Sequence, residues 1–209
     1  MTPLYETDPK AIYRSSFAII RAEVDLAAAS PVLSRMIVRM IHACGMTDVP
    51  HDIQTSPQAA EIGHAALRGG APILCDSSML AAGITRARLP CKNEVLCTLN
   101  DPGVTELAVR LGTTRSAAAV ELWRGRFDGA VVAIGNAPTA LFHLLEMLTA
   151  GGPKPALVLG LPVGFVGAAE SKRALASNTL GIPFVTLHGR RGGSAIASAA
   201  VNSLACDDE

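Results

Sequence analysis

The sequence is poor in charged residues. Only 17% of its 209 residues are Asp, Glu, Lys or Arg, and 18 basic residues balance 18 acidic ones. A formal net charge of zero leaves no long-range field that would draw the chain to nucleic acid or to an anionic membrane. Hydrophobic residues make up 49%, a content that excludes an intrinsically disordered chain. We therefore expect one folded domain, residues 1–209, that holds any anionic ligand with local arginines and backbone amides.

Long apolar runs are missing as well. Uncharged stretches such as residues 129–145 and 155–169 are interrupted by Gly and Pro and fall short of a membrane span. Residues 1–10 contain no apolar signal segment. These absences predict a soluble, cytoplasmic protein with neither a membrane nor nucleic acid as partner.

Several motifs that would identify a reaction are absent. The five cysteines form no C-x-x-C pair, which argues against a disulfide framework and against a zinc site. The chain has no G-x-S-x-G elbow, no G-x-G-x-x-G fingerprint and no G-x-x-x-x-G-K-[ST] loop. A serine hydrolase and the common nucleotide-binding enzymes are therefore poor matches.

Capping residues predict where several helices begin and end. Asp8-Pro9 and Ser30-Pro31 each combine an N-cap with a proline in the first turn, and Gly45 should end the second of these helices. Two more helices are expected, one beginning at Ser56-Pro57 and ending at Gly69-Gly70, and one over Ser194–Leu204.

Short apolar runs follow from residue 72 onward, and most are followed by a turn and a helical pattern. Continuous apolar strands that alternate with helices are typical of a parallel sheet covered on both faces. We expect an α/β, three-layer, doubly wound fold, with a mostly parallel five-stranded sheet, helices on both faces and a helical N-terminal segment. The predicted strands are Pro72–Cys75, Glu94–Leu99, Ala130–Ile134, Ala156–Leu161 and Pro183–Leu187.

Glycine-containing loops follow the last three predicted strands, at residues 135–140, 160–168 and 188–194. In an open α/β sheet, ligands bind outside the carboxyl ends of the strands, where backbone amides can hold anions. The same glycines are equally compatible with tight turns that have no ligand.

Two polar residues stand at the ends of predicted helices. His42 lies near a helix C-terminus, where a protonated imidazole is stabilised, and its reference pKa of about 6.5 suits proton donation; a capping or core histidine would look the same. Arg115 opens another helix and could grip a carboxylate bidentately, although Thr114 or Ser116 could simply cap that helix.

Taken together, the chain resembles the precorrin-8X methylmutase family of cobalamin (vitamin B12) biosynthesis. The resemblance spans nearly the whole chain in family order, and its glycine loop and the run after residue 161 are highly specific. The matching segments are Ser16-Phe17 with Ile19, Ile20 and Glu23; residues 39–45 (RMIHACG); residues 72–76 (PILCD); residues 83–86 (GITR); Thr114-Arg115-Ser116; residues 135–140 (GNAPTA); residues 162–172 (PVGFVGAAESK); Gly189, Arg190, residues 192–194 (GGS) and Asn202.

The resemblance implies a flavodoxin-like sheet, a homodimer and an isomerase without metal or organic cofactor. The reaction would move a methyl group from C-11 to C-12 of the tetrapyrrole precorrin-8X and give hydrogenobyrinate. The family's catalytic histidine falls on His42, which would protonate the nitrogen of ring C. Residues 86–90 (RARLP) look more like the aerobic branch, which acts on a metal-free precorrin.

The resemblance and the charge pattern also suggest how the substrate carboxylates are held. A product that keeps the same contacts should leave slowly, so it could be handed to the next pathway enzyme. The expected substrate-binding residues are Ser16, Arg39, Thr85, Arg86, Arg88, Arg115, Ser116, Gly135, Asn136, Ala137, Thr139, Gly164 and Arg190.

Two alternatives belong to other classes. A non-catalytic tetrapyrrole-binding or carrier protein would keep the arginines and loops without needing His42. A nucleotide- or phosphosugar-binding α/β enzyme would need a ribose-binding carboxylate and a phosphate fingerprint, and neither is evident in the sequence.

Overall fold

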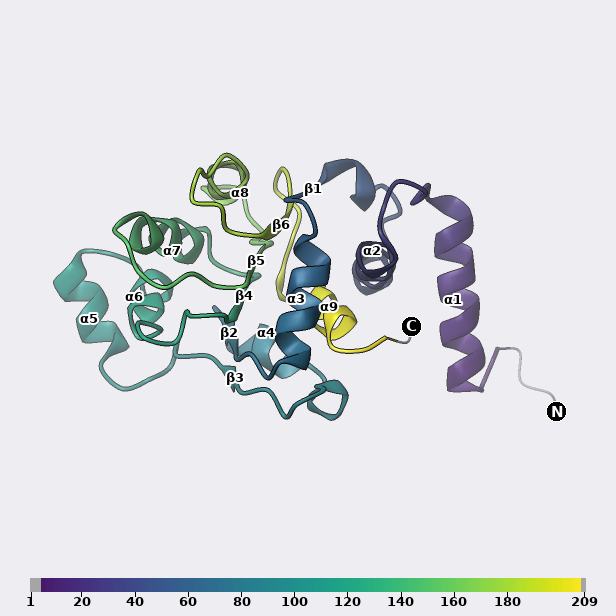
Figure 1. The fold of residues 1–209 in the computed structure, drawn as a ribbon, viewed down its shortest axis with the longest axis horizontal. Helices are drawn as coiled ribbons and strands as arrows, with labels where there is room; N and C mark the ends of the chain where they lie inside the picture. The colour runs from purple at the N-terminus through teal and green to yellow at the C-terminus, as the bar shows by residue number, and fades with distance from the viewer. Residues whose placement is uncertain (1–4, 208–209) are drawn as a thin grey trace.

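A single sheet lies between two layers of helices, and one further helix lies outside them (Figure 1). The structure is a computed structural model that describes residues 5–207; the outermost residues of the expected domain, 1–4 and 208–209, lie outside this range. Strands follow the order β1-β6-β5-β4-β2-β3. All neighbouring strands are parallel except β1 and β6, which are antiparallel. The strand bounds are β1 Ile53–Thr55, β2 Ile73–Cys75, β3 Val95–Leu96, β4 Val131–Ile134, β5 Leu157–Gly160 and β6 Phe184–Leu187.

The α/β fold with helices on both faces of a mostly parallel sheet is confirmed, but the sheet has six strands instead of five. The missed strand, β1, has three residues and lies at the sheet edge against β6. Partly exposed on both faces, it has no apolar run that would reveal it in the sequence. β3 is shorter than its predicted run and covers only Val95–Leu96.

Capping residues position the first two helices as expected. In α1 (Pro9–Glu23) the Asp8 side chain accepts from the Lys10 amide, and in α2 (Pro31–Cys44) the Ser30 side chain accepts from the Leu33 amide. Gly45 ends α2 with a left-handed φ of +70° and donates its amide to the Ile41 carbonyl at 2.7 Å, the conformation for which glycine is favoured.

The third helix, α3 (Ala59–Arg68), begins later than predicted. Ser56 does not cap it, because the Ser56 hydroxyl accepts from the Phe184 amide at 3.0 Å and so fastens the chain to β6. Its end at Gly69 and the whole of α9 (Ser194–Leu204) agree with the sequence. The remaining helices are α4 Ser78–Gly83, α5 Val104–Leu111, α6 Arg115–Glu121, α7 Pro138–Thr149 and α8 Ala168–Ala176, with short 3-10 turns η1 Val49–Asp52 and η2 Arg86–Arg88.

Two apolar cores lie on opposite faces of the sheet, because successive strand residues point to opposite sides. Val131 and Ala133 of β4 face a core built with α2, α3, α4 and α9. Val132 and Ile134 face a second core that contains α7 and Trp123. Helix α1 packs on the outer side of α2 and therefore adds a partial further layer (Figure 1). Among residues 5–207, no helix is both long enough and apolar enough to cross a membrane.

Candidate active site

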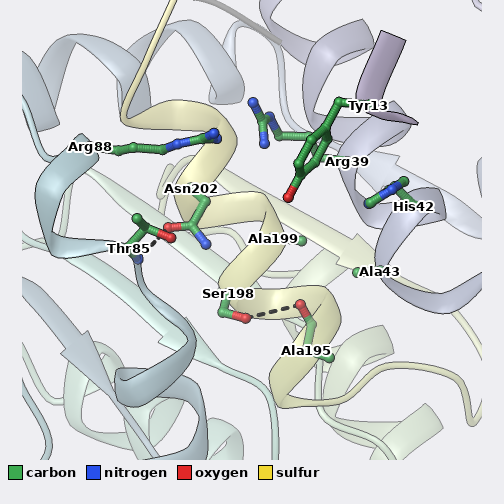
Figure 2. A pocket seen from close by; sticks show the side chains of 10 residues that line it. All are labelled: Tyr13, Arg39, His42, Ala43, Thr85, Arg88, Ala195, Ser198, Ala199 and Asn202. Atoms are coloured by element: carbon green, nitrogen blue, oxygen red, sulfur yellow. Dashed lines mark hydrogen bonds between the residues drawn. The ribbon is translucent and has the colours of Figure 1, made fainter. Parts of the chain in front are cut away.

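A polar pocket of about 390 Å³ lies where α1, α2, α9 and η2 meet. Figure 2 shows its side chains converging from these four elements. Four of the expected site residues line it. Its complete lining is Tyr13, Arg39, His42, Ala43, Thr85, Arg88, Ala195, Ser198, Ala199 and Asn202.

His42 stands in the last turn of α2, just before the Gly45 cap. Its ring is exposed and lies beside two aromatic rings, with centroids 5.5 Å from Tyr13 at an interplanar angle of 31° and 5.2 Å from Phe17 at 72°. Across residues 5–207, no protein group hydrogen-bonds either nitrogen of the imidazole. His42 is thus oriented by ring packing, and its nitrogens can meet a ligand.

Two guanidinium groups give the pocket a positive wall. Arg39 is only 9% exposed, and its Cζ lies 5.5 Å from the centre of the Phe17 ring. Burial lowers the pKa of Arg39, and the charge of nearby Arg88 lowers it further. Arginine keeps its proton despite such shifts. Arg39 and Arg88 therefore place two positive charges in the same pocket. An anionic ligand would relieve their repulsion.

A hydrogen-bonded turn holds Thr85 at the mouth of the pocket. The Asn202 side chain accepts from the Thr85 amide at 2.8 Å through Oδ1 and donates to the Gly83 carbonyl at 2.9 Å through Nδ2. Both ends of this amide are therefore used to fix the chain between α4 and η2 against α9. The Ser198 hydroxyl donates to the Ala195 carbonyl of its own helix at 3.0 Å.

Sequence reasoning did not assign a site role to Tyr13, Ser198 or Asn202. One signal was available for α9: Ser198 and Asn202 are four residues apart in an otherwise small and apolar helix, which places both on one face. No such signal distinguished Tyr13, because an aromatic residue in a helix is more often part of a core.

The backbone amides of the glycine loop after β4 bind a side chain of the protein itself. The carboxylate of Asp76 accepts the amides of Gly135 at 3.0 Å, Asn136 at 2.9 Å and Ala137 at 2.7 Å. Burial raises the pKa of Asp76, and the three amides act in the opposite direction. The amides expected to bind substrate carboxylates thus hold an internal carboxylate in this structure. In this loop only the side chains of Asn136 and Thr139 remain exposed to a ligand.

The remaining predicted residues do not line this pocket. Arg115 donates to the Leu99 carbonyl and to Asn100 Oδ1, both at 3.1 Å. Thr139 shares a 2.8 Å hydroxyl contact with Thr114, the N-cap of α6, and Ser116 lies on the same helix. This group belongs to the opposite helix layer from His42 (Figure 1). Ser16 on α1 and Arg86 on η2 also lie outside the lining of the pocket.

The loop after β5 carries an exposed apolar tip. Phe165 and Val166 are 83% and 89% exposed. Arg190 lies over the Phe165 ring at 5.1 Å and accepts the Gly164 amide through its carbonyl at 3.1 Å. Gly164 and Arg190 therefore meet, but neither lines the pocket of His42.

A buried lysine fixes the loop that leads into α9. Lys172 is fully buried and donates to the Arg191 carbonyl at 2.6 Å; burial lowers the pKa of Lys172 to about 8. Arg191 pairs with Asp48 at 2.7 Å and with Asp52. These contacts join the start of α9 to the segment after α2, so they connect two walls of the pocket.

In the described part of the chain, no group of three or more His, Cys, Asp or Glu side chains is arranged so that it could hold a metal ion. All five cysteines lie in this part, and none of them forms a disulfide there. Fold and pocket together define an α/β protein with one imidazole and two guanidinium groups in one polar pocket, a combination whose charge suits an anionic ligand.

Comparison with known proteins agrees with this description. Residues 11–206 match the precorrin-8X methylmutase family. A precorrin-8X methylmutase from Pseudomonas aeruginosa is 60% identical over 98% of this chain and 99% of its own length. A cobalt-precorrin-8 methylmutase from Priestia megaterium is 36% identical over 94% of this chain and 87% of its own. A crystal structure of the Thermus thermophilus precorrin-8X methylmutase superimposes with a TM-score of 0.85 at 40% identity and covers 94% of each chain.

The chain belongs to the precorrin-8X methylmutase family. A methylmutase moves a methyl group within one molecule, so the family places the chain among the isomerases.

Proposed function

We propose that the chain converts precorrin-8X into hydrogenobyrinate by moving the methyl group from C-11 to C-12, without a cofactor and with His42 as proton donor to the ring C nitrogen. The observation that carries this proposal is an imidazole that accepts or donates no hydrogen bond within residues 5–207, in a pocket that also contains Arg39 and Arg88. The relatives named for precorrin-8X support it, because their identity of about 60% exceeds the 36% of the cobalt-precorrin-8 relative. The substrate proposed is accordingly the metal-free one.

The chemistry requires a proton in the right place. Protonating the nitrogen of ring C withdraws electrons from the adjoining carbons and eases migration of the methyl group. Because substrate and product are isomers, the proton returns to His42 afterwards. A positioned general acid contributes about 10²–10⁴-fold, or roughly 3–5 kcal/mol. The remaining acceleration would come from holding the macrocycle in a distorted conformation through its peripheral carboxylates.

The proposed carboxylate contacts fall into two groups. Arg39, Thr85 and Arg88 lie in the pocket with His42, and Ser16 and Arg86 lie on the adjoining α1 and η2. The second group lies in other parts of the fold and consists of Arg115, Ser116, Asn136, Thr139, Gly164 and Arg190.

A homodimer would account for this separation, because a second copy can bring the distant group to the pocket. The exposed Phe165 and Val166 support such a contact, since large apolar side chains this exposed are typical of an interaction surface. We propose a cytoplasmic homodimer that completes each pocket with residues of both copies.

Mixing two inactive variants tests the shared pocket. His42→Ala and Arg115→Ala homodimers are each inactive if both residues are needed, and random exchange of subunits then creates dimers with one intact site. Recovery of activity on mixing supports residues from two copies. If activity does not recover, although mass spectrometry verifies that subunits have exchanged, His42 and Arg115 do not form one pocket from two different copies.

The reaction itself is tested with His42→Ala and the smaller change His42→Gln. Purified protein is mixed with precorrin-8X, and formation of the corrin chromophore is followed by ultraviolet-visible spectroscopy. We expect turnover to fall by about 10²–10⁴-fold while ligand binding is retained. A carrier protein predicts the opposite: no turnover in the unsubstituted protein and little effect of either variant on binding.

Slow product release is a further part of the proposal. If substrate and product make the same carboxylate contacts, uniform binding leaves the product tightly held, so transfer to the next pathway enzyme would assist turnover. A stopped-flow measurement of hydrogenobyrinate dissociation tests this: dissociation much faster than turnover contradicts it.

A further inference from the structure

A second hollow adjoins the pocket of His42 along helix α1. Its volume is about 590 Å³, and it shares Tyr13 and Arg88 with the pocket. In Figure 2 the Tyr13 hydroxyl points into the pocket, and the backbone of Tyr13 belongs to α1. The lining of this second hollow, here called the α1 groove, is Lys10, Tyr13, Arg14, Phe17, Ala18, Arg21 and Arg88.

The α1 groove combines positive charge with an apolar floor. Lys10, Arg14 and Arg21 lie at spacings of four and seven residues, which put them along one side of a helix. Phe17 and Ala18 form apolar surface between them. Arg14 forms a long, exposed ion pair with Asp8 at 3.8 Å and also lies near the charge of Glu6, and such exposed pairs are weak in water. A flat ligand with several carboxylates could therefore displace it.

Size connects the two hollows. Ligand pockets for drug-sized molecules measure about 300–1,000 Å³, and a tetrapyrrole with acetate and propionate arms is larger than most such ligands. The pocket around His42, at about 390 Å³, lies near the lower end of that range. The α1 groove provides further space next to it, and the linings of the two hollows share the Tyr13 and Arg88 side chains.

We propose that the α1 groove is the second half of the substrate site, where Lys10 and Arg14 bind peripheral carboxylates of the macrocycle while His42 faces the reacting ring. This inference rests on the proposed function for the identity of the ligand. It adds a task for α1: Lys10 and Arg14 determine affinity for a polycarboxylate and take no part in the proton transfer. Tyr13 and Arg88 contact the macrocycle where it passes from one hollow into the other.

The double variant Lys10→Ala/Arg14→Ala tests this assignment. We expect the KM for precorrin-8X and the Kd for hydrogenobyrinate to rise about tenfold, as for loss of charge-assisted contacts, while kcat changes less than twofold. The increase should shrink at high salt, since exposed charges are screened. The charge-preserving variant Lys10→Arg/Arg14→Lys should restore most of the affinity.

Two controls separate local charge from general effects. Arg110→Ala removes an exposed cation from α5, far from the groove (Figure 1), and should leave KM and Kd unchanged. Fully esterified hydrogenobyrinate has no carboxylates. Its Kd should therefore be the same for the double variant and for the unsubstituted protein. Equal loss of affinity with Arg110→Ala would indicate only a net-charge effect and overturn the inference.

The two proposals fail in different ways. Unchanged KM and Kd in the Lys10→Ala/Arg14→Ala variant overturn the α1 groove as a substrate site, even if His42→Ala abolishes turnover. If the unsubstituted protein binds hydrogenobyrinate but never forms it from precorrin-8X, the proposed function fails, whereas a tenfold weaker Kd in the double variant still supports the groove.

Discussion

The carboxyl edge of the sheet and the helical layer around α2 and α9 use their polar groups in different ways. At the edge, the amides of the glycine loop hold Asp76, and Arg115 holds the chain at Leu99 and Asn100. In the helical layer, the His42 ring packs beside the rings of Tyr13 and Phe17 and lines the open pocket. The glycine motif at residues 135–140 thus stabilises the fold through Asp76, whereas the proposed proton donor, His42, lies on helix α2.

The largest effect that would sharpen this contrast is expected at Asp76. Replacing Asp76 with Ala leaves three amides, two buried and one partly buried, without their acceptor, at about 1–3 kcal/mol for each unsatisfied group, so we expect a loss of about 3 kcal/mol in the free energy of unfolding. Asp76→Asn keeps one oxygen as acceptor and should lose less. Urea denaturation monitored by circular dichroism measures both variants. Near-normal stability of Asp76→Ala would mean that these amides can turn to water or to a ligand.

A pH-dependent effect is expected at Lys172, the buried support of the loop before α9. The pKa of Lys172 is lowered to about 8, against about 10.4 in an unfolded chain. Between these values the unfolded chain binds more protons than the folded one, so Lys172 makes stability rise with pH in this window, by about 2–3 kcal/mol.

A difference measurement isolates the Lys172 contribution. Cys75 changes stability with pH in the opposite direction to Lys172. Burial raises the pKa of the Cys75 thiol, so the thiol loses its proton at a lower pH in the unfolded chain than in the folded one. Its contribution to stability therefore falls as pH rises above about 8.5. Denaturation of the unsubstituted protein and of Lys172→Met from pH 7.5 to 10 (roughly the window set by these pKa values) should show a pH-dependent difference. A difference that does not change with pH contradicts a buried, titrating lysine.

Gly135 tests whether the edge supports the pocket through packing. A Cβ at this position would lie 2.9 Å from Ser194 Cα and 2.9 Å from Ala197 Cβ, so Gly135→Ala pushes on the first turn of α9. We expect a loss of about 1–3 kcal/mol, typical of overpacking, and a higher KM because α9 forms a wall of the pocket. Gly112→Ala is the control for an added methyl group, since that position has open space although its left-handed φ of +61° carries a small backbone cost.

The elements with strong local signals could be predicted from the sequence, and those fixed by tertiary contacts could not. The caps at Asp8, Ser30 and Gly45 predicted helix ends correctly, because each acts within one turn of the chain. Ser56 carried the same signal but is used by β6, a partner far away in sequence. The edge strand β1 likewise forms by pairing with β6, which is far away in sequence.

The candidate site shows the same division. His42, Arg39, Thr85 and Arg88 were selected by motif and charge, and the structure brings them into one pocket. Tyr13 and Ser198 enter the site only because α1 and α9 pack on either side of α2, which no local pattern encodes. The Asp76 contact was also hidden, since its three amide partners lie about sixty residues away, at separations of 59 to 61.

The smallest expected effect on stability, but an informative one, concerns Asn202. Its side chain fastens Thr85 and Gly83 to α9 through exposed hydrogen bonds, so Asn202→Ala should lower the free energy of unfolding by only about 1 kcal/mol. Because Thr85 stands at the mouth of the pocket, we expect KM to rise severalfold with kcat nearly unchanged, which is the signature of a positioning residue. Asn202→Asp keeps the acceptor for the Thr85 amide but loses the donor to Gly83, so it should recover part of the affinity. If both variants lower kcat and leave KM alone, Asn202 acts on the proton transfer at His42 and not on the placement of Thr85.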